Sequence, residues 1–361
     1  MTFARYMELC LYHPEHGYYM QGRERTGVGG DYFTNADLHP IFARLIARQA
    51  AEMWEILGRP ARFTWVEMGA GRGLFALDFL EGVNRAHPTF AASLDYVAVE
   101  PGPHQQDRIR ERLARAQWED SVRLVSDLGG LEAVTGCFFS NELADAFPVS
   151  VVTRLGGRLK EIYVDSEGDA LHEKPGPISD PAIAKLVARY ASHLEEGQRV
   201  EVTVLIPQWM RTVAEKLARG FMITIDYGDL AGYLYTSDRP RGTLLAYRGH
   251  RTSEDFYNTP GECDLTAHTN FSALIDCGEE AGLHFGGFVT QEQFLMALGA
   301  PNEFADLYHP GQGEIEKLQS RLRLKRLLDP TGMGSVFNVL IQHRGLELPA
   351  LTGLKYARRG S

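Results

Sequence analysis

The sequence has few cysteines and no long apolar run. Its four cysteines, Cys10, Cys137, Cys263 and Cys277, form no CxxC pair, and no histidine cluster accompanies them at zinc-ligand spacing. We therefore expect packing cysteines, a reducing compartment and no metal site. No apolar run approaches the roughly 20 residues that span a bilayer, and no signal-peptide pattern opens the chain.

An excess of basic charge is also missing, because the 361 residues carry a formal net charge of −10. A nucleic-acid-binding protein usually presents a basic face, so this balance argues against nucleic acid as the main partner. With 44% apolar residues the chain can bury a large core without disulfides. Its length indicates one elaborated domain or two domains.

What the sequence does contain is a glycine-rich turn after an apolar run at 63–68. Glu67 lies near the end of that run, and glycines follow as Gly69, Gly71 and Gly73. Apolar residues at 75, 79 and 83 then recur at helical spacing, so the pattern predicts strand, turn and helix. Glycine allows a tight turn and close approach of a ligand to main-chain N–H groups, beside the positive end of the helix dipole. A dinucleotide fingerprint would have glycine at 74, where this chain has leucine.

The pattern resembles the first motif of class I S-adenosylmethionine (SAM) methyltransferases. In that resemblance Glu67 binds the ammonium group of SAM, directly or through water. The glycine turn then lies against the amino-acid and ribose parts of the cofactor.

Acids also end the next two predicted strands. Glu100 ends the strand at 94–100, and an acid there can accept hydrogen bonds from both ribose hydroxyls, although it stands further from the glycine turn than the usual spacing. Asp127 ends the strand at 122–127, and with Leu128 it is the candidate for contact with adenine. An equally weighted alternative is that Asp127 caps its own turn.

A third polar group follows the buried strand at 136–140. Asn141, Glu142 and Asp145 stand at its carboxyl end, where open α/β sheets place their ligands. A capping cluster is the alternative. Asp226 and Tyr227 end a further apolar strand at 221–228 in the same manner.

A long irregular stretch is predicted at 229–270, and a loop of this length is usually functional or disordered. Its aromatic residues favour an ordered, site-covering loop. His250 and His268 are possible bases in it, and each is more often a structural hydrogen-bonding residue.

Taken together, the motifs resemble the MidA family, whose mitochondrial members assist assembly of respiratory complex I. The motifs are, in order, the aromatic loop at 12–19, Gly30-Asp31-Tyr32-Phe33-Thr34, Glu67-x-Gly69-x-Gly71-x-Gly73, Asn141-Glu142-x-x-Asp145-Ala146-x-Pro148, Ile225-Asp226-Tyr227-Gly228, Gly242-Thr243-Leu244 with His250, Asp264-Leu265-Thr266-Ala267-His268, Gln293-Phe294-Leu295 and Met333-Gly334.

The resemblance implies a Rossmann-like α/β fold of class I, with a seven-stranded, mostly parallel sheet that contains one antiparallel strand. It implies SAM as cofactor, with Thr34 and Asn141 among the binding residues. For the mitochondrial members it implies methylation of an arginine on a complex I subunit. The pattern starts almost at the first residue and leaves no room for a transit peptide, so a bacterial cytoplasmic protein is expected.

Two departures from the family lie near the expected substrate mouth. Asn35-Ala36-Asp37 replaces a Ser-Pro-Glu-like triplet, and Leu143-Ala144 replaces a bulky aromatic pair. The acceptor can therefore differ from the mitochondrial one.

The predicted organisation has five segments. They are an N-terminal helical extension or lid at 1–60, a SAM-binding half at 61–148, an inserted hairpin–helix subdomain on the substrate side at 149–206, the rest of the sheet with its long loop at 207–345, and a tail at 346–361. Strand-like alternation on both sides of Gly156-Gly157 predicts the hairpin of the insertion.

An arginine acceptor sets a chemical requirement, because its guanidinium is protonated with a pKa above about 12. Paired carboxylates can hold it and take a proton as methyl transfers. Our hypothesis assigns this to Glu142 and Asp145, helped by Asp226 or Tyr227, with His268 as a further candidate base. The alternatives are a SAM-binding assembly factor with little turnover, a small-molecule methyltransferase and, disfavoured by the leucine at 74, a nucleotide-dependent oxidoreductase.

Overall fold

The computed structural model describes residues 1–357 except 24, 26, 28, 29, 32, 33 and 310, and it leaves the side chain of Met333 undescribed. Tyr32 and Phe33 of the predicted motif at 30–34, and the end of the predicted tail at 358–361, lie outside the described residues. The chain forms two compact units. Unit 1 comprises Met1–Tyr32, Leu143–Met210 and Gly228–Cys277, and unit 2 comprises Phe33–Glu142, Arg211–Tyr227 and Gly278–Ser361.

The boundaries of these two units differ from those of the five predicted segments. The extension expected at 1–60 contributes to both units, and the insertion expected at 149–206 belongs to unit 1. The roles given to the segments, a lid and a substrate-side subdomain, remain predictions.

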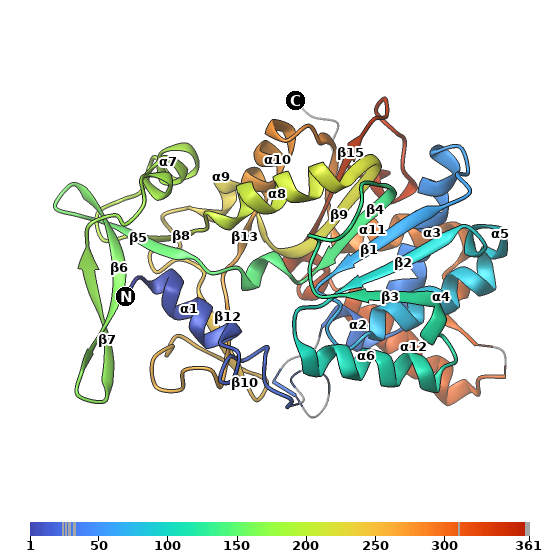
Figure 1. Ribbon diagram of the computed structural model, residues 1–361, viewed down its shortest axis with the longest axis horizontal. Coiled ribbons are helices and arrows are strands. Elements are labelled where there is room, and N and C mark those ends of the chain that lie inside the picture. Colours follow the sequence, from blue (N-terminus) through green and yellow to red (C-terminus); the bar gives the residue numbers. More distant parts are fainter. Residues whose placement is uncertain (24, 26, 28–29, 32–33, 310, 358–361) are drawn as a thin grey trace. The chain divides into compact units, whose positions relative to one another are not determined.

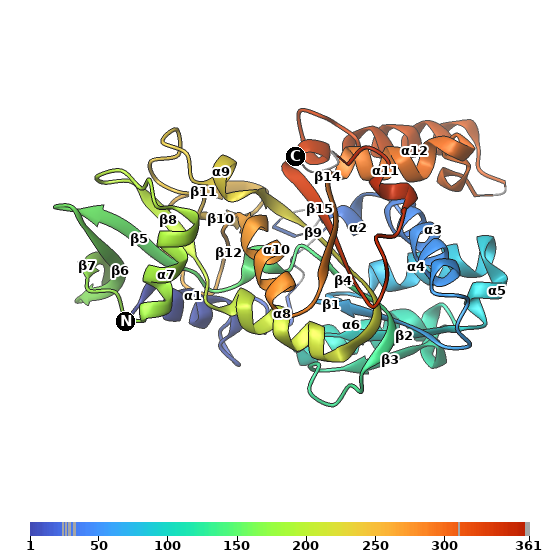
Figure 2. The same ribbon diagram turned by 90° about the horizontal axis from the view of Figure 1, so that it is seen from above.

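Unit 2 is built on a twisted sheet whose strands run in the order β14-β15-β9-β4-β1-β2-β3. Neighbouring strands from β9 to β3 are parallel, and β15 is antiparallel to both β9 and β14 (Figures 1 and 2). The strands are β1 (Phe63–Met68), β2 (Leu94–Val99), β3 (Val122–Val125), β4 (Val134–Asn141), β9 (Leu217–Asp229), β14 (His284–Thr290) and β15 (Phe337–Arg344). The predicted class, a mostly parallel seven-stranded sheet with one antiparallel strand, is confirmed; β13 (Thr269–Asn270) additionally pairs with the end of β9.

The sheet of unit 2 is covered by helices, and every residue of β1 is buried, as expected for a parallel strand. The helices that lie wholly in this unit are α2 (Asn35–Leu38), α3 (Ile41–Ile56), α4 (Leu74–Ala86), α5 (Pro88–Ala91), α6 (Pro103–Arg115), α11 (Gln291–Gly299), α12 (Glu314–Leu327) and α13 (Met333–Val336). Figure 2 shows α11 beside α3.

An aromatic stack fixes α4 on the sheet directly after the glycine turn. The ring of Trp65 on β1 lies 4.5 Å from that of Phe79, and the ring of Phe75 lies 4.5 Å from that of Phe139 on β4, measured between centroids. Trp65, Phe79 and Phe139 are almost completely buried. Aromatic pairs at such separations add about 0.5–1.5 kcal/mol beyond the area that they bury. The start of α4, and with it the end of the turn, is therefore held rigidly.

Unit 1 contains two antiparallel sheets. The larger has the order β7-β6-β5-β8 and the smaller β11-β10-β12. The strands are β5 (Ser150–Leu155), β6 (Arg158–Glu167), β7 (Ala170–Gly176), β8 (Arg199–Val202), β10 (Leu245–Arg248), β11 (Arg251–Ser253) and β12 (Asp264–Thr266), and the helices are α1 (Phe3–Tyr12), α7 (Pro181–Tyr190) and α9 (Ala231–Leu234). Helices α8 (Leu205–Lys216) and α10 (Phe271–Glu280) cross from one unit to the other along the chain.

The hairpin predicted around Gly156-Gly157 is confirmed as β5 and β6. Both glycines have positive φ, 58° and 72°, as a two-residue hairpin turn requires. The stretch at 229–270, predicted to be irregular, instead contains α9 and four short strands. Its strands β10, β11 and β12 form a sheet of their own, in which β10 is paired on both sides.

In the part of the chain that the structure describes, no helix is long and apolar enough to cross a bilayer.

A close approach of β4 to β1 depends on Gly136. A Cβ placed on Gly136 would lie 1.9 Å from the carbonyl oxygen of Thr64, so Gly136→Ala should force the two strands apart. We expect a loss of at least about 1–3 kcal/mol of stability, the range for overpacked cores, seen as a lower melting temperature by calorimetry. Gly130→Ala is the matched control, because a Cβ there meets no atom within 4 Å. Equal melting temperatures for the two variants would contradict this account.

Candidate functional site

The glycine turn follows β1 and adopts a conformation that side chains rarely permit. Gly69, Gly71 and Gly73 all have positive φ, at 75°, 54° and 71°. The N–H of Gly69 donates to Val99 O on β2 at 2.9 Å, which ties the turn to the neighbouring strand. A Cβ on Gly73 would lie 3.1 Å from the side chain of Ile109 on α6. The three glycines are therefore explained by backbone conformation and close packing before any ligand is considered.

Glu100, the predicted ribose acid, holds this turn in place. Its Oε2 accepts a hydrogen bond from Gly71 N at 2.8 Å, and its Oε1 accepts one from Gly102 N at 2.8 Å. The side chain is only 7% exposed. A carboxylate oxygen has two lone pairs, so an oxygen that accepts a main-chain N–H can also accept a second donor such as a ribose hydroxyl. The position of Glu100 beside the glycine turn thus fits its predicted role as the acid that binds the ribose.

Glu67 is a buried acid beside this turn. Its Oε2 accepts a hydrogen bond from the hydroxyl of Tyr96 at 2.7 Å. Burial raises the pKa of Glu67 to about 8, and the charge of Glu100 acts in the same direction, whereas the Tyr96 hydrogen bond lowers it. A nearby cation would stabilise the charged form. An ammonium or sulfonium group therefore suits this position electrostatically.

Asp127 caps its own turn, which was the alternative role. Its Oδ1 accepts a hydrogen bond from Gly129 N at 2.6 Å. Strand β3 ends at Val125, two residues earlier than predicted, and Leu128 is buried. One oxygen of the Asp127 carboxylate remains for other partners, so contact with adenine stays a prediction.

Helix α2 connects to the end of β4 through Asn35. The N–H of Asn35 donates to Glu142 Oε1 at 2.9 Å, and its side-chain amide donates to Asn141 Oδ1 at 3.2 Å. The amide of Asn141 also donates to Glu142 Oε1, at 2.9 Å, and Gln291 Nε2 donates to Asn35 Oδ1 at 2.9 Å. Two sequence-predicted residues, Asn141 and Glu142, are thus held together by a buried asparagine that the sequence marked only as a departure from the family.

The same short helix connects to the glycine turn. Asp37 Oδ2 accepts hydrogen bonds from the N–H of Thr34 at 3.0 Å and from its hydroxyl at 2.8 Å. Asp37 Oδ1 forms an ion pair with Arg72, inside the turn, and the Asp37 side chain is only 4% exposed. Thr34, a predicted cofactor-binding residue, is therefore fixed by the acid that also anchors the turn. Sequence reasoning missed this ion pair and the contact of Gln291.

Glu142 has an unusual backbone and an unusual pKa. Its φ is 53°, in the left-handed region that favours glycine, and its N–H donates to Ile225 O at 2.9 Å. Burial raises the pKa of Glu142 to about 8; hydrogen bonds from Asn35 and Asn141 lower it, and the charges of Asp226 and Asp37 raise it. A strained, half-buried acid with a pKa near neutrality is a typical catalytic candidate.

Asp226 and Tyr227 lie on β9, next to β4 in the same sheet. The Asp226 side chain is fully buried, and its Oδ1 accepts a hydrogen bond from Tyr227 N at 2.8 Å. The ring of Tyr227 packs 4.0 Å from that of Phe337, between centroids. Unit 2 therefore brings three of the five predicted catalytic residues to neighbouring strand ends.

The other two, Asp145 and His268, belong to unit 1. Asp145 is buried, and its carbonyl oxygen accepts a hydrogen bond from Ala267 N at 3.0 Å, so the two predicted residues are near neighbours in the fold. The N–H of His268 donates to Thr243 Oγ1 at 3.0 Å. Burial, reinforced by the charge of Arg239, lowers the pKa of His268 to about 4. The imidazole is therefore neutral at pH 7 and a weak base.

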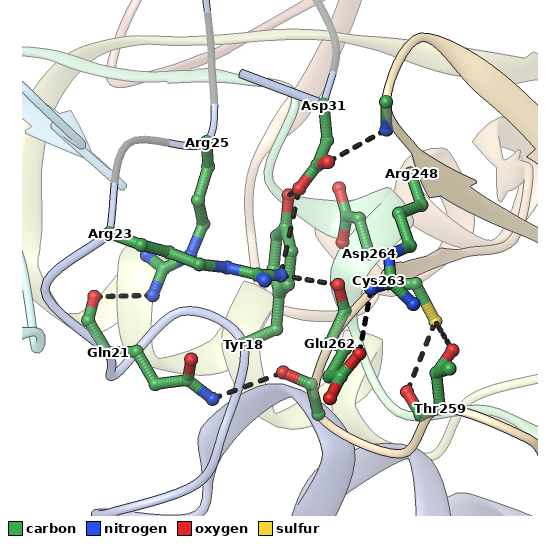
Figure 3. Close-up of polar contacts among 12 residues, drawn as sticks. Tyr18, Gln21, Arg23, Arg25, Asp31, Arg248, Thr259, Glu262, Cys263 and Asp264 are labelled. Atoms are coloured by element: carbon green, nitrogen blue, oxygen red, sulfur yellow. Dashed lines mark hydrogen bonds and ion pairs between the residues drawn. The ribbon is translucent and has the colours of Figure 1, made fainter. Parts of the chain in front are cut away.

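Tyr18, in the aromatic loop at 12–19, packs within unit 1 against the segment that follows the loop (Figure 3). The Tyr18 hydroxyl donates to Asp31 Oδ2 at 2.8 Å, and Asp31 Oδ1 accepts from Gly249 N at 2.8 Å. The guanidinium carbons of Arg23 and Arg25 each lie 4.9 Å from the centre of the Tyr18 ring. These are the contacts of a packed loop; a role as a cap over a ligand stays a prediction.

Comparison with known proteins places these residues in a family context. The family model for a putative S-adenosyl-L-methionine-dependent methyltransferase matches residues 45–289. The protein arginine methyltransferase NDUFAF7 homolog, mitochondrial, of Drosophila melanogaster is 26% identical over 95% of this chain and 81% of its own. Its Homo sapiens counterpart, protein arginine methyltransferase NDUFAF7, mitochondrial, is 25% identical over 96% of this chain and 81% of its own.

A solved structure is similar over almost the whole chain. It is a COG1565 superfamily member and likely methyl transferase from Burkholderia thailandensis, bound to S-adenosyl-homocysteine. Its TM-score is 0.89 at 29% sequence identity, and the match covers 99% of this chain and 91% of that one.

The glycine turn offers a direct test of the predicted cofactor contact. Gly71→Ala forces a side chain to φ 54° but leaves its Cβ no closer than 4.0 Å to any neighbour, so the fold should lose only about 1–2 kcal/mol. We expect the affinity for SAM, measured by calorimetry, to fall roughly tenfold or more, because ligand and main chain approach closely there. Gly58→Ala imposes similar strain, at φ 87°, with open space around its Cβ. Equal SAM affinities in the two variants would show that the turn does not contact the cofactor.

Proposed function

The chain belongs to the family of putative S-adenosyl-L-methionine-dependent methyltransferases, and on that premise we propose that it transfers the methyl group of SAM to an arginine side chain of a protein. The curated relatives are named protein arginine methyltransferases, which supports an arginine acceptor. As the finer proposal, the acceptor is a subunit of respiratory complex I and the enzyme works in a bacterial cytoplasm.

SAM is the methyl donor, and residues of unit 2 fit its parts. In the proposed arrangement the carboxylate of Glu100 accepts the ribose hydroxyls and that of Glu67 faces the ammonium group. Gly69, Gly71 and Gly73 give the ligand access to the main chain. The adenine side is assigned to Asp127 and Leu128, and Thr34 and Asn141 complete the set. When bound, SAM supplies a methyl group on a sulfonium, ready for in-line displacement.

The observation that carries the arginine proposal is the environment of Glu142. Burial disfavours the charged form of its carboxylate, and repulsion from the negative charge of Asp226, also in unit 2, disfavours it further. Both effects raise the pKa of Glu142. An incoming guanidinium relieves this repulsion and matches the geometry of carboxylates. Glu142 then accepts a guanidinium proton as the methyl group transfers, and it becomes neutral, the form that its site favours.

The carboxylate pair of the sequence hypothesis is thereby refined. Within unit 2 the second acid beside Glu142 is Asp226, and Tyr227 follows it on β9. Asp145 and His268, placed in unit 1, stay candidates. Among these, His268 is the weaker as a base, because its pKa is about 4.

Removal of the Glu142 carboxylate should stop catalysis and spare binding. With methyl-labelled SAM and a bacterial proteome extract, wild-type protein should label arginine residues, identified by mass spectrometry of the labelled peptides. Glu142→Gln should lower the rate about 10²–10⁴-fold, the usual contribution of a general base. Its dissociation constant for SAM should stay within about threefold of the wild-type value. Glu111→Gln, an exposed acid on α6, is the control.

Three outcomes separate the alternatives. Label on another residue type, or on a small molecule, would reject the arginine proposal. Tight SAM binding without transfer to any molecule would favour an assembly factor. Full activity in Glu142→Gln would leave methyl transfer standing and remove Glu142 from the mechanism.

The rate should also depend on pH in a defined direction. The active form of Glu142 is the carboxylate, and its pKa is about 8, so kcat/KM for the acceptor should rise with pH and level off above about 8. Below that value it should fall tenfold per pH unit. Initial rates at saturating SAM isolate this effect from the titration of Glu67. A rate that is flat between pH 6 and 9 would contradict the assignment.

A further inference from the structure

Unit 1 contains a cleft of about 510 Å³ that the assignments above leave unexplained, although His268 is one of its lining residues. This volume lies within the range of ordinary ligand pockets. Its walls come from strands β5, β7, β8 and β10, from the segment before β10, and from the segments that follow β11 and β12. The lining residues are Val151, Glu173, Arg199, Glu201, Arg239, Arg241, Gly242, Thr243, Leu244, Leu245, Glu254, Phe256 and His268.

Two of the three arginines in this cleft are neutralised by partners. Arg199 forms a bidentate ion pair with Glu173, with nitrogen–oxygen distances of 2.9 and 2.5 Å. Arg241 pairs with Glu254 at 2.5 Å. Their charges therefore leave little attraction for a ligand.

Arg239 differs from both. Among the residues that the structure describes, its guanidinium makes no ion pair and no hydrogen bond, and its Nη1 is buried without a partner. The nearby His268 is neutral at pH 7 and does not offset the charge. A buried guanidinium donor without an acceptor is costly, and a ligand that carries an anionic oxygen would satisfy it.

Glu201, in the same cleft, has a buried acceptor oxygen that lacks a donor among the described residues. Its side chain is 96% buried, with 4% exposed, and Oε2 accepts hydrogen bonds from Thr243 N at 2.9 Å and Thr243 Oγ1 at 3.0 Å. Its Oε1 is buried and, within the described part of the chain, has no hydrogen-bond partner. Gly242, at φ 78°, leaves room for this oxygen, because a Cβ there would lie 2.0 Å from it. Oε1 can therefore accept from a ligand N–H.

We propose that this cleft binds an extended acidic segment of the protein acceptor, with a side-chain carboxylate on Arg239 and a main-chain N–H on Glu201 Oε1. The proposal rests on the proposed function, since it takes the ligand to be a protein. The charge count favours a carboxylate over a phosphate, because one free guanidinium matches one negative charge, while the other two arginines of the lining are already paired with Glu173 and Glu254. A peptide segment supplies both the acid and the N–H donor that these two groups lack.

The test uses the full chain and a library of 12-residue peptides that contain one fixed arginine and random flanking positions. Peptides retained by the immobilised protein are sequenced. Wild type should enrich Asp and Glu over Asn and Gln at one or two positions, by roughly tenfold, the factor for one hydrogen bond to a charged group. Arg239→Gln should lose this enrichment, and Arg241→Gln, which removes a paired arginine from the same cleft, should keep it.

A second measurement guards against misfolding. Removal of an unpaired, half-buried cation should leave the melting temperature of Arg239→Gln unchanged or higher, and the affinity of this variant for SAM should match that of wild type. No enrichment of acids by wild type, or enrichment that survives in Arg239→Gln, would overturn the proposal.

The failure of this inference can be told apart from the failure of the proposed function. If labelled SAM methylates arginine in the retained peptides without any preference for acids, the function stands and the cleft has no such role. If acidic peptides bind through Arg239 but acquire no label, the cleft assignment stands and arginine methylation is wrong.

Discussion

The hydrogen bonds that Glu100 makes to two main-chain N–H groups are the contact on which the cofactor side of unit 2 depends. Through Gly71 they fix the turn after β1, and through Gly102 they fix the start of α6. The same turn contains Arg72, whose ion pair with Asp37 holds α2 in place. Helix α2 then positions Asn141 and Glu142 through the hydrogen bonds of Asn35. One buried carboxylate thus begins a chain of contacts that runs from the second strand to the proposed base.

Local patterns in the sequence predicted much of this. The glycine turn, the strands beside it and the acids at their ends could be read because each signal spans only a few residues, with alternating glycines and apolar periodicity. The hairpin at Gly156-Gly157 was predictable for the same reason. The resemblance of the combined motifs to a methyltransferase family supplied the sheet topology, which local patterns do not contain.

The rest depends on contacts between residues far apart in the chain. Asn35 contacts residues more than 100 positions away, and the partners Asp37 and Arg72 are 35 positions apart, so no periodicity reveals either. The strands within 229–270 have only two to four residues and were too short to recognise. Asp127 shows a further limit, because the same acid suits a turn cap and a ligand contact, and only the observed hydrogen bond to Gly129 reveals the cap.

The left-handed backbone of Glu142 has a consequence for how this protein would respond to selection. A glycine at that position would relieve about 1–2 kcal/mol of strain, but it would leave the N–H of Asn35 and the amide of Asn141 without the acceptor that they share, a cost of about 1–3 kcal/mol for a buried donor. The two effects are similar in size, so selection for stability alone gains little from replacing the acid. Selection for turnover, by contrast, should retain it.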